Sequence, residues 1–277
     1  MISNKIINYR NLNLKNIKKY NHKYNNSIPF PYIVIDNFLN KKFAKLLLNS
    51  FEINSDWINY SFVNNFKKYG FNNRKKMNKE LNNLFNSLAS TKFVSKLKKI
   101  TSINGLFLDP KLDGGGLHQI FKGGHLNVHT DFSSHTNKPN WKRVLNILVY
   151  LNKNWKKKYK GNLELWSKDG KKKITEIFPK FNRCVIFLTD ENSFHGHPTK
   201  LNCPANISRK SIAAYYFIKS KKNLKLSPTN YIHRPKDNFK TKLLIKFDKN
   251  LNSIYSFLKR KNILNDRKIT KILNFFS

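Results

Sequence analysis

The sequence is poor in cysteine and has no long apolar run. Cys184 and Cys203 are its only cysteines, too few for a disulfide framework and without the paired spacing of a thiolate zinc site. A reducing cytoplasm fits this composition. The longest apolar runs are the length of strands, and the basic N-terminus lacks the apolar core of a signal peptide. We therefore expect a cytoplasmic protein with no leader and no transmembrane segment.

Acidic residues are also scarce, because 15 Asp and Glu stand against 54 Lys and Arg, which gives a net charge of +39. A surface of this kind attracts phosphates without sequence specificity. Lys, Asn and Ile are abundant throughout the chain, however, as an AT-rich genome would also produce. The sequence therefore predicts nonspecific contact with polyanions and disfavours nucleic acid as the substrate.

Hydrophobic residues make up 39% of the chain, which predicts a folded protein. The sequence pattern divides the chain into three parts. Residues 1–27 form a basic, Asn-rich arm without clear periodicity, either loose or docked late. Residues 28–219 form the main domain. Residues 220–277 form a basic, helical extension whose apolar side chains keep helical spacing, and we expect these to pack on the main domain: Leu243, Leu244, Phe247, Ile254, Phe257 and Leu258. The alternative is that this amphipathic tail lies on an anionic membrane surface.

The order of elements predicts the fold class. A strand is expected within 28–39, followed by a helix that Asn40 caps, and helical spacing continues over 76–99. From 103 to 219 at least six short strands alternate with turns, and 132–142 reads as a polar loop. We predict an α+β protein with a double-stranded β-helix (jelly-roll) core, flanked by N-terminal helices and by the helical C-terminal tail.

A candidate metal site lies in the stretch HQIFKGGHLNVHTD, residues 118–131. His129 and Asp131 are two residues apart, so on a strand they share a face, about 6.6 Å apart along the chain. After the later strand RCVIFLT, the segment DENSFHGHP supplies His195 and His197. Two histidines and one carboxylate form the facial triad that binds iron(II) and leaves three positions open.

Further polar residues point to a bound carboxylate. Arg209 follows the histidine pair and offers a fixed charge and a planar fork, as the far end of a dicarboxylate cosubstrate requires. Asn146 and Tyr150 are four residues apart in the apolar strand RVLNILVYLN, so they share one face. Buried polar groups need partners, and a ligand would provide them.

At these positions the sequence resembles the iron(II)/2-oxoglutarate-dependent oxygenases, specifically the prolyl-hydroxylase-like group. The resemblance covers about residues 28–219, in the segments VIDNFL, GGGLHQIFKGGHLNVHTDF, RVLNILVYLNKNWKKKYKGNLELW, and VIFLTDENSFHGHPTKLNCP through SRKSIAAYYF. It implies that His129, Asp131 and His195 are the iron ligands, with the spacing to Arg209 favouring His195 over His197. It also implies that Arg209 holds the C5 carboxylate of 2-oxoglutarate.

The resemblance assigns roles to other residues as well. Tyr150 matches a tyrosine whose hydroxyl contacts the same carboxylate, and Tyr215 matches an aromatic residue near the metal. Gln119 would contact cosubstrate or substrate, with simple strand polarity as the alternative. The implied cofactors are Fe(II), 2-oxoglutarate and O2. The implied reaction is hydroxylation of an unactivated C–H bond with release of succinate and CO2, and the carboxylate of Asp131 favours hydroxylation over halogenation.

Two other functions compete with this interpretation. The first is a zinc hydrolase that uses His125, His129 or the pair His195 and His197, although Leu126 stands where the HLNVH motif would need Glu. The second is a catalytically inactive oxygenase-fold module that binds a polyanionic partner. For an active oxygenase, the substrate classes are a prolyl residue, a free or carrier-bound amino acid, a sugar or a lipid-linked glycan, entering beside the loop 132–142.

Overall fold

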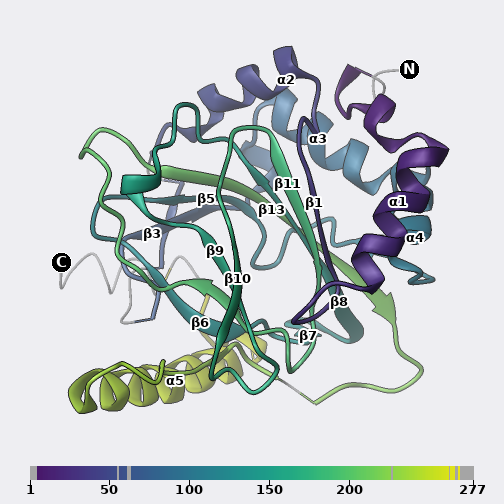
Figure 1. Cartoon of the computed structure of the whole chain (residues 1–277). Helices are drawn as coiled ribbons and strands as arrows, with labels where there is room; N and C mark the ends of the chain where they lie inside the picture. The colour runs from purple at the N-terminus through teal and green to yellow at the C-terminus, as the bar shows by residue number, and fades with distance from the viewer. Residues whose placement is uncertain are drawn as a thin grey trace.

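Two antiparallel sheets form the centre of the protein in the computed structural model, which describes residues 5–54, 56–60, 64–225, 227–261, 263–265 and 268 (Figure 1). The large sheet has the order β1 (Tyr32–Ile35), β11 (Arg183–Leu188), β8 (Lys138–Tyr150), β13 (Arg209–Lys219), β5 (Gly116–Ile120), β3 (Lys68–Phe71) and β2 (Ile58–Asn59). In addition, β4 (Phe107–Leu108) pairs with β13 and β7 (Ser134–His135) with β8. The small sheet has the order β10 (Lys173–Ile177), β9 (Leu163–Trp166), β12 (His195–His197), β6 (Leu126–Thr130) and β14 (Asn230–Tyr231). This arrangement confirms the predicted jelly roll.

Helices cover the outer face of the large sheet (Figure 1). They are α1 (Leu14–Asn25), α2 (Lys41–Leu46), α3 (Lys79–Ala89) and α4 (Thr91–Thr101), with a 3-10 turn over Leu47–Phe51 after α2. Side chains alternate along β8, so that Ile147 and Val149 pack into the helical layer. Asn146 and Tyr150 therefore lie on the inner face, between the two sheets. The helical layer thus determines that the face of β8 with Asn146 and Tyr150 points toward the small sheet.

The N-terminal arm docks on this helical layer. Ile6, Ile7 and Leu12 are buried, and α1 packs beside α4 with Ile17 and Tyr24 in the core. Ile17 and Tyr24 are seven residues apart and therefore share one face of the helix. Lys and Asn surround this short repeat in the sequence, so no periodicity was predicted there. Residues 1–4 of the arm lie outside the described residues.

The helical pattern predicted over 76–99 belongs to two helices. Ser90 has extended backbone angles, φ −64° and ψ 143°, so α3 ends before it. Its hydroxyl accepts the backbone N–H of Phe93 at 3.3 Å, which caps α4. Sequence periodicity missed this break because the apolar stripe continues across it. The predicted cap at Asn40 is confirmed, since its side chain accepts the N–H of Lys42 at 3.0 Å.

The stretch 132–142 is a strand hairpin and not the predicted polar loop. β7 and the first residues of β8 pair there, with His135 opposite Lys138. Ser134 and His135 are buried, and His135 Nε2 lies 3.5 Å from the carboxylate of Asp109. The sequence also missed β10. In both places the strands carry mostly polar side chains, and their pairing depends on neighbours far along the chain.

The C-terminal extension contains the predicted helix, α5 (Phe239–Arg260), but its packing differs from the prediction. Leu243, Phe247 and Ile254 are 58%, 61% and 57% exposed, so these predicted core residues face outward. The helix packs beside β14 of the small sheet, and its residues Ile245 and Asp248 are buried, with Asp248 accepting from the backbone N–H of Asn64 at 3.1 Å. Residues 262, 266, 267 and 269–277 lie outside the described part of the chain. Within the described part, no helix has the length and apolarity needed to cross a membrane.

Candidate metal centre

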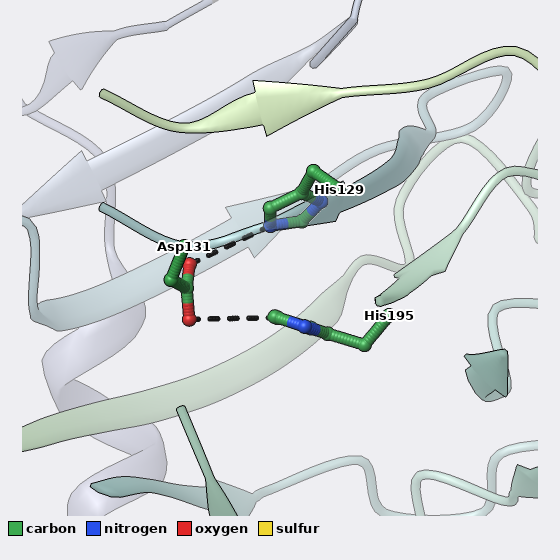
Figure 2. A group of neighbouring side chains, drawn as sticks. All are labelled: His129, Asp131 and His195. Atoms are coloured by element: carbon green, nitrogen blue, oxygen red, sulfur yellow. Dashed lines mark ion pairs between the residues drawn. The ribbon is translucent and has the colours of Figure 1, made fainter. Parts of the chain in front are cut away.

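Two histidines and an aspartate converge between the sheets (Figure 2). β6 carries His129, Asp131 follows its end, and β12 places His195 directly opposite His129. Asp131 reaches both rings, because its Oδ1 is 3.6 Å from His129 Nε2 and its Oδ2 is 3.6 Å from His195 Nε2. One ligand atom from each residue lies within 4.8 Å of the others. All three side chains are at most 10% exposed.

Hydrogen bonds to the backbone set the tautomers of both rings. His129 Nδ1 lies 2.7 Å from the carbonyl oxygen of Asn127, and His195 Nδ1 lies 2.9 Å from that of Ser193. A carbonyl only accepts, so each Nδ1 carries the proton and each Nε2 presents a lone pair. Two lone pairs and a carboxylate then face one another with no proton between them. A divalent cation would satisfy this donor set, so the residues fit an iron(II) ion.

Asp131 is held in its ionised form. Burial by itself would raise the pKa of this carboxyl, but the guanidinium of Arg143 lowers its pKa well below the ordinary value. Arg143 donates from NH2 to Asp131 Oδ2 at 2.7 Å, and the Asn146 amide donates to the same oxygen at 3.2 Å. Arg143 is itself fully buried, with its Cζ 3.4 Å from the ring centre of Tyr215. These contacts orient the carboxylate toward the histidines.

Arg143 was not predicted as a site residue, because strand parity places it on the opposite face of β8 from Asn146. Arg143 and Asn146 are three positions apart, so regular alternation would put the two on opposite sides of β8. The ladder with β13 pairs Leu145 with Tyr216 and then Arg143 with Phe217, which leaves Val144 unpaired. This bulge turns Arg143 toward the metal group. The sequence feature that could have identified Arg143 is its position as a basic residue at the start of an apolar strand.

Of the two predicted cosubstrate-binding residues Arg209 and Tyr150, Arg209 lines the cavity of the metal group and Tyr150 contacts Arg209. Arg209 donates from Nε to the Gly161 carbonyl at 2.8 Å and from NH2 to the Tyr150 hydroxyl at 3.2 Å. A Cβ on Gly161 would lie 3.1 Å from Arg209 Cδ and 2.6 Å from Leu201 Cδ2, so this glycine leaves room for the arginine. Both partners are buried. Among the described residues no carboxylate pairs with Arg209, so its charge is available to a ligand.

The other predicted contacts are divided between two faces. Asn146 uses its amide on Asp131, and Tyr215 lines the cavity, where burial raises its pKa to about 12. Gln119, by contrast, lies on the outer face of β5 and donates to the Ser208 hydroxyl at 2.9 Å. The structure thus does not bring Gln119 to the cavity, since alternation along β5 gives the inner face to its neighbour His118.

His197 lines the cavity near Arg209 but lies outside the metal group. The pairing of β12 with β6 shifts after His195, so that His197 is opposite Leu126. Burial lowers the pKa of His197 well below its ordinary value, and neither ring nitrogen has a hydrogen-bond partner among the described residues. His125 precedes strand β6, so the HLNVH segment lacks the helix that a zinc hydrolase motif requires.

We expect the metal-free protein to lose stability as the pH falls below about 6.5. Burial lowers the pKa of His195 from 6.5 to about 4. Between these values the unfolded chain binds the extra proton, so stability rises with pH and is lost on acidification. This one group should remove on the order of 2 kcal/mol by about pH 4.5. Urea unfolding of the wild type and of His195→Gln at about pH 7.5 and 4.5 measures the loss, which should be smaller in the variant. An equal loss in both proteins would contradict the assignment.

Residues 115–217 match the model of the 2OG-Fe(II) oxygenase superfamily. Egl nine homolog 1 of Rattus norvegicus is 32% identical over 89 residues, which cover 32% of this chain and 25% of that protein. The Homo sapiens protein of the same name is also 32% identical over 89 residues, which cover 32% of this chain and 20% of its length. The chain therefore spans a quarter or less of the length of these curated relatives.

Solved structures share the fold. A prolyl hydroxylase of Trichoplax adhaerens, in complex with a hypoxia inducible factor oxygen degradation domain peptide fragment, has a TM-score of 0.53 and 18% identity over 73% of this chain and 90% of that chain. A prolyl-4-hydroxylase of Pseudomonas putida has a TM-score of 0.51 and 13% identity over 72% of this chain and 99% of that chain. Residues 115–217 thus match the 2OG-Fe(II) oxygenase superfamily in sequence, and the jelly roll that carries the His129–Asp131–His195 group is similar in fold to solved prolyl hydroxylases.

Proposed function

We propose that this protein is an Fe(II)- and 2-oxoglutarate-dependent dioxygenase that hydroxylates an unactivated C–H bond and releases succinate and CO2. The observation that carries the proposal is one cavity that contains both the His129–Asp131–His195 group and Arg209. A metal group alone would serve many reactions. A metal group beside the buried guanidinium of Arg209 matches 2-oxoglutarate, which needs a metal ion at one end and a cationic partner for the carboxylate at the other.

Each residue has a defined part in this proposal. His129, Asp131 and His195 would hold Fe(II), and Arg209 with the Tyr150 hydroxyl would hold the C5 carboxylate of 2-oxoglutarate. Bound iron and 2-oxoglutarate, together with O2, supply the oxidising power for hydroxylation.

The surrounding chain contributes orientation and charge. The backbone carbonyls of Asn127 and Ser193 keep the ring nitrogens turned toward Asp131, and Arg143 keeps that carboxylate ionised. Apolar side chains such as Leu148 and Leu163 line the same cavity and limit access of water. The residues present therefore support cosubstrate positioning and exclusion of solvent.

The substrate belongs to the same proposal. The similar structures are prolyl hydroxylases, and one was solved with a peptide, which supports a prolyl residue in a peptide as the first class to test. Free or carrier-bound amino acids, sugars and lipid-linked glycans are further classes. We also propose a cytoplasmic location, supported by the two buried free thiols Cys184 and Cys203. Nonspecific polyanion contact is supported by the charge of +39.

The first prediction is that the purified protein converts 2-oxoglutarate to succinate when Fe(II) and O2 are supplied. Turnover without substrate should be slow, and a prolyl peptide or another true substrate should accelerate it. Succinate release across a peptide and metabolite set measures the reaction, with a chelated sample as the control. No turnover by the wild type under any of these conditions, including uncoupled turnover, would favour the inactive binding module.

A further inference from the structure

Lys68 on β3 lies on the same face of the large sheet as Arg209. Arg209 pairs with Ile120 of β5, and Ile120 pairs with Lys68. Residues that stand directly opposite across antiparallel strands share a face. All three side chains line the cavity of the metal group. Two strand spacings separate Lys68 from Arg209, so their Cα atoms are roughly 10 Å apart.

Neighbouring residues on β3 and β5, together with Tyr60, surround the side chain of Lys68. Its Nζ is 5.6 Å from the ring centre of Tyr60. A Cβ on Gly70 would lie 2.6 Å from Tyr60 Cε2, so this glycine makes room for the ring. His118 lies in the adjacent row on β5, and burial together with the charge of Lys68 lowers its pKa well below the ordinary value. His118 is therefore neutral and adds no second positive charge beside Lys68.

The cavity contains more positive than negative groups. Asp131 is its only acidic lining residue among the described residues, and Arg143 already pairs with it at 2.7 Å. No carboxylate in the described part of the chain pairs with Lys68. Burial lowers the pKa of Lys68 to about 8, a shift that Asp131 opposes and that Arg143 and Arg209 increase. Lys68 is thus mostly charged at neutral pH and carries its charge without a counter-ion, which is unfavourable.

Loading the proposed cofactors does not supply that counter-ion. The C5 carboxylate of 2-oxoglutarate would pair with Arg209, which Gly161 and Tyr150 fix in place. The other end of that cosubstrate would be held at the metal group, which leaves neither end for Lys68. Lys68 would still have no anionic partner. The remaining molecule that enters this cavity is the substrate.

We propose that Lys68, with the His118 ring beside it, forms a subsite for an anionic group of the substrate, a carboxylate or a phosphate ester. This inference rests on the proposed function, because it assigns the rest of the cavity to Fe(II) and 2-oxoglutarate. It narrows the substrate to molecules whose anionic group lies within reach of β3 while the C–H bond lies at the metal.

The experiment titrates acetate and inorganic phosphate separately into protein loaded with Mn(II) and saturated with 2-oxoglutarate, and follows binding by calorimetry. Wild type should bind at least one anion saturably, and which anion binds distinguishes a carboxylate from a phosphate site. Lys68→Met should weaken that binding at least ~10-fold, since a charge-assisted hydrogen bond contributes ~1.5–3 kcal/mol. Lys68→Arg should restore most of it. The matched control is Lys172→Met, because Lys172 is exposed on another surface and reports binding to the general positive charge.

Three results would overturn the subsite. They are no saturable binding of either anion, equal anion affinity of wild type and Lys68→Met, and a rise of the 2-oxoglutarate Kd in Lys68→Met as large as in Arg209→Ala. The last result would assign Lys68 to the cosubstrate. Succinate release by the wild type is measured in parallel, so a failure of the proposed function shows as absent turnover and is distinct from a failure of the subsite.

Discussion

Replacing His195 by alanine should abolish tight Fe(II) binding, whereas His197→Ala should keep most of it. His195 Nε2 faces Asp131 at 3.6 Å, while His197 lies outside the metal group. Loss of a residue that only orients a ligand costs about 10- to 100-fold in metal affinity, so loss of a ligand should cost at least ~100-fold. Calorimetric titration with Mn(II) and assays of succinate release with Fe(II) measure the two effects.

The two histidines offer a matched pair, since both are buried on β12 two residues apart. Both variants remove a buried ring, so a general loss of packing should appear in both. Urea unfolding of each variant separates that loss from the loss of metal. A variant His197→Ala without metal binding, beside a His195→Ala that still binds, would contradict the assignment of the third ligand.

The second large effect is expected for Arg209→Ala, which should raise the Kd for 2-oxoglutarate roughly 100-fold. A charge-assisted hydrogen bond contributes ~1.5–3 kcal/mol, and the buried carboxylate would lose its cationic partner. Arg209→Lys should give an intermediate Kd, because an ammonium keeps the charge but lacks the planar fork. Titration of 2-oxoglutarate into Mn(II)-loaded protein measures each value.

Metal affinity is the control for this prediction. Arg209 contacts Gly161 and Tyr150 and none of the three proposed metal ligands. Arg209→Ala should therefore bind Mn(II) nearly as well as the wild type, while His195→Ala should lose the metal and with it the cosubstrate. An unchanged Kd for 2-oxoglutarate in Arg209→Ala would move the cosubstrate to another part of the cavity.

Local spacing was enough to predict a large part of the fold and of the candidate site. The period of two along a strand predicts that His129 and Asp131 share one face of their strand. It also places Asn146 and Tyr150 on one face of β8. Strand-length apolar runs with turns between them predicted the jelly roll. These features depend on residues only a few positions apart, so no knowledge of distant partners is needed.

The tertiary structure decided the features that depend on pairing between distant segments. The bulge at Val144 brings Arg143 to Asp131, and the register of β12 against β6 selects His195 over His197 for the metal group. The same pairing places Gln119 away from the cavity, as the alternative of simple strand polarity had it, and the docking of α5 leaves Leu243 and Phe247 exposed, contrary to the prediction. In each case strand register or helix docking is set by the packing of whole sheets, where a shift of one residue exchanges the two faces. The sequence by itself thus determined which chemical groups are available, and the sheet pairing determined which of them meet.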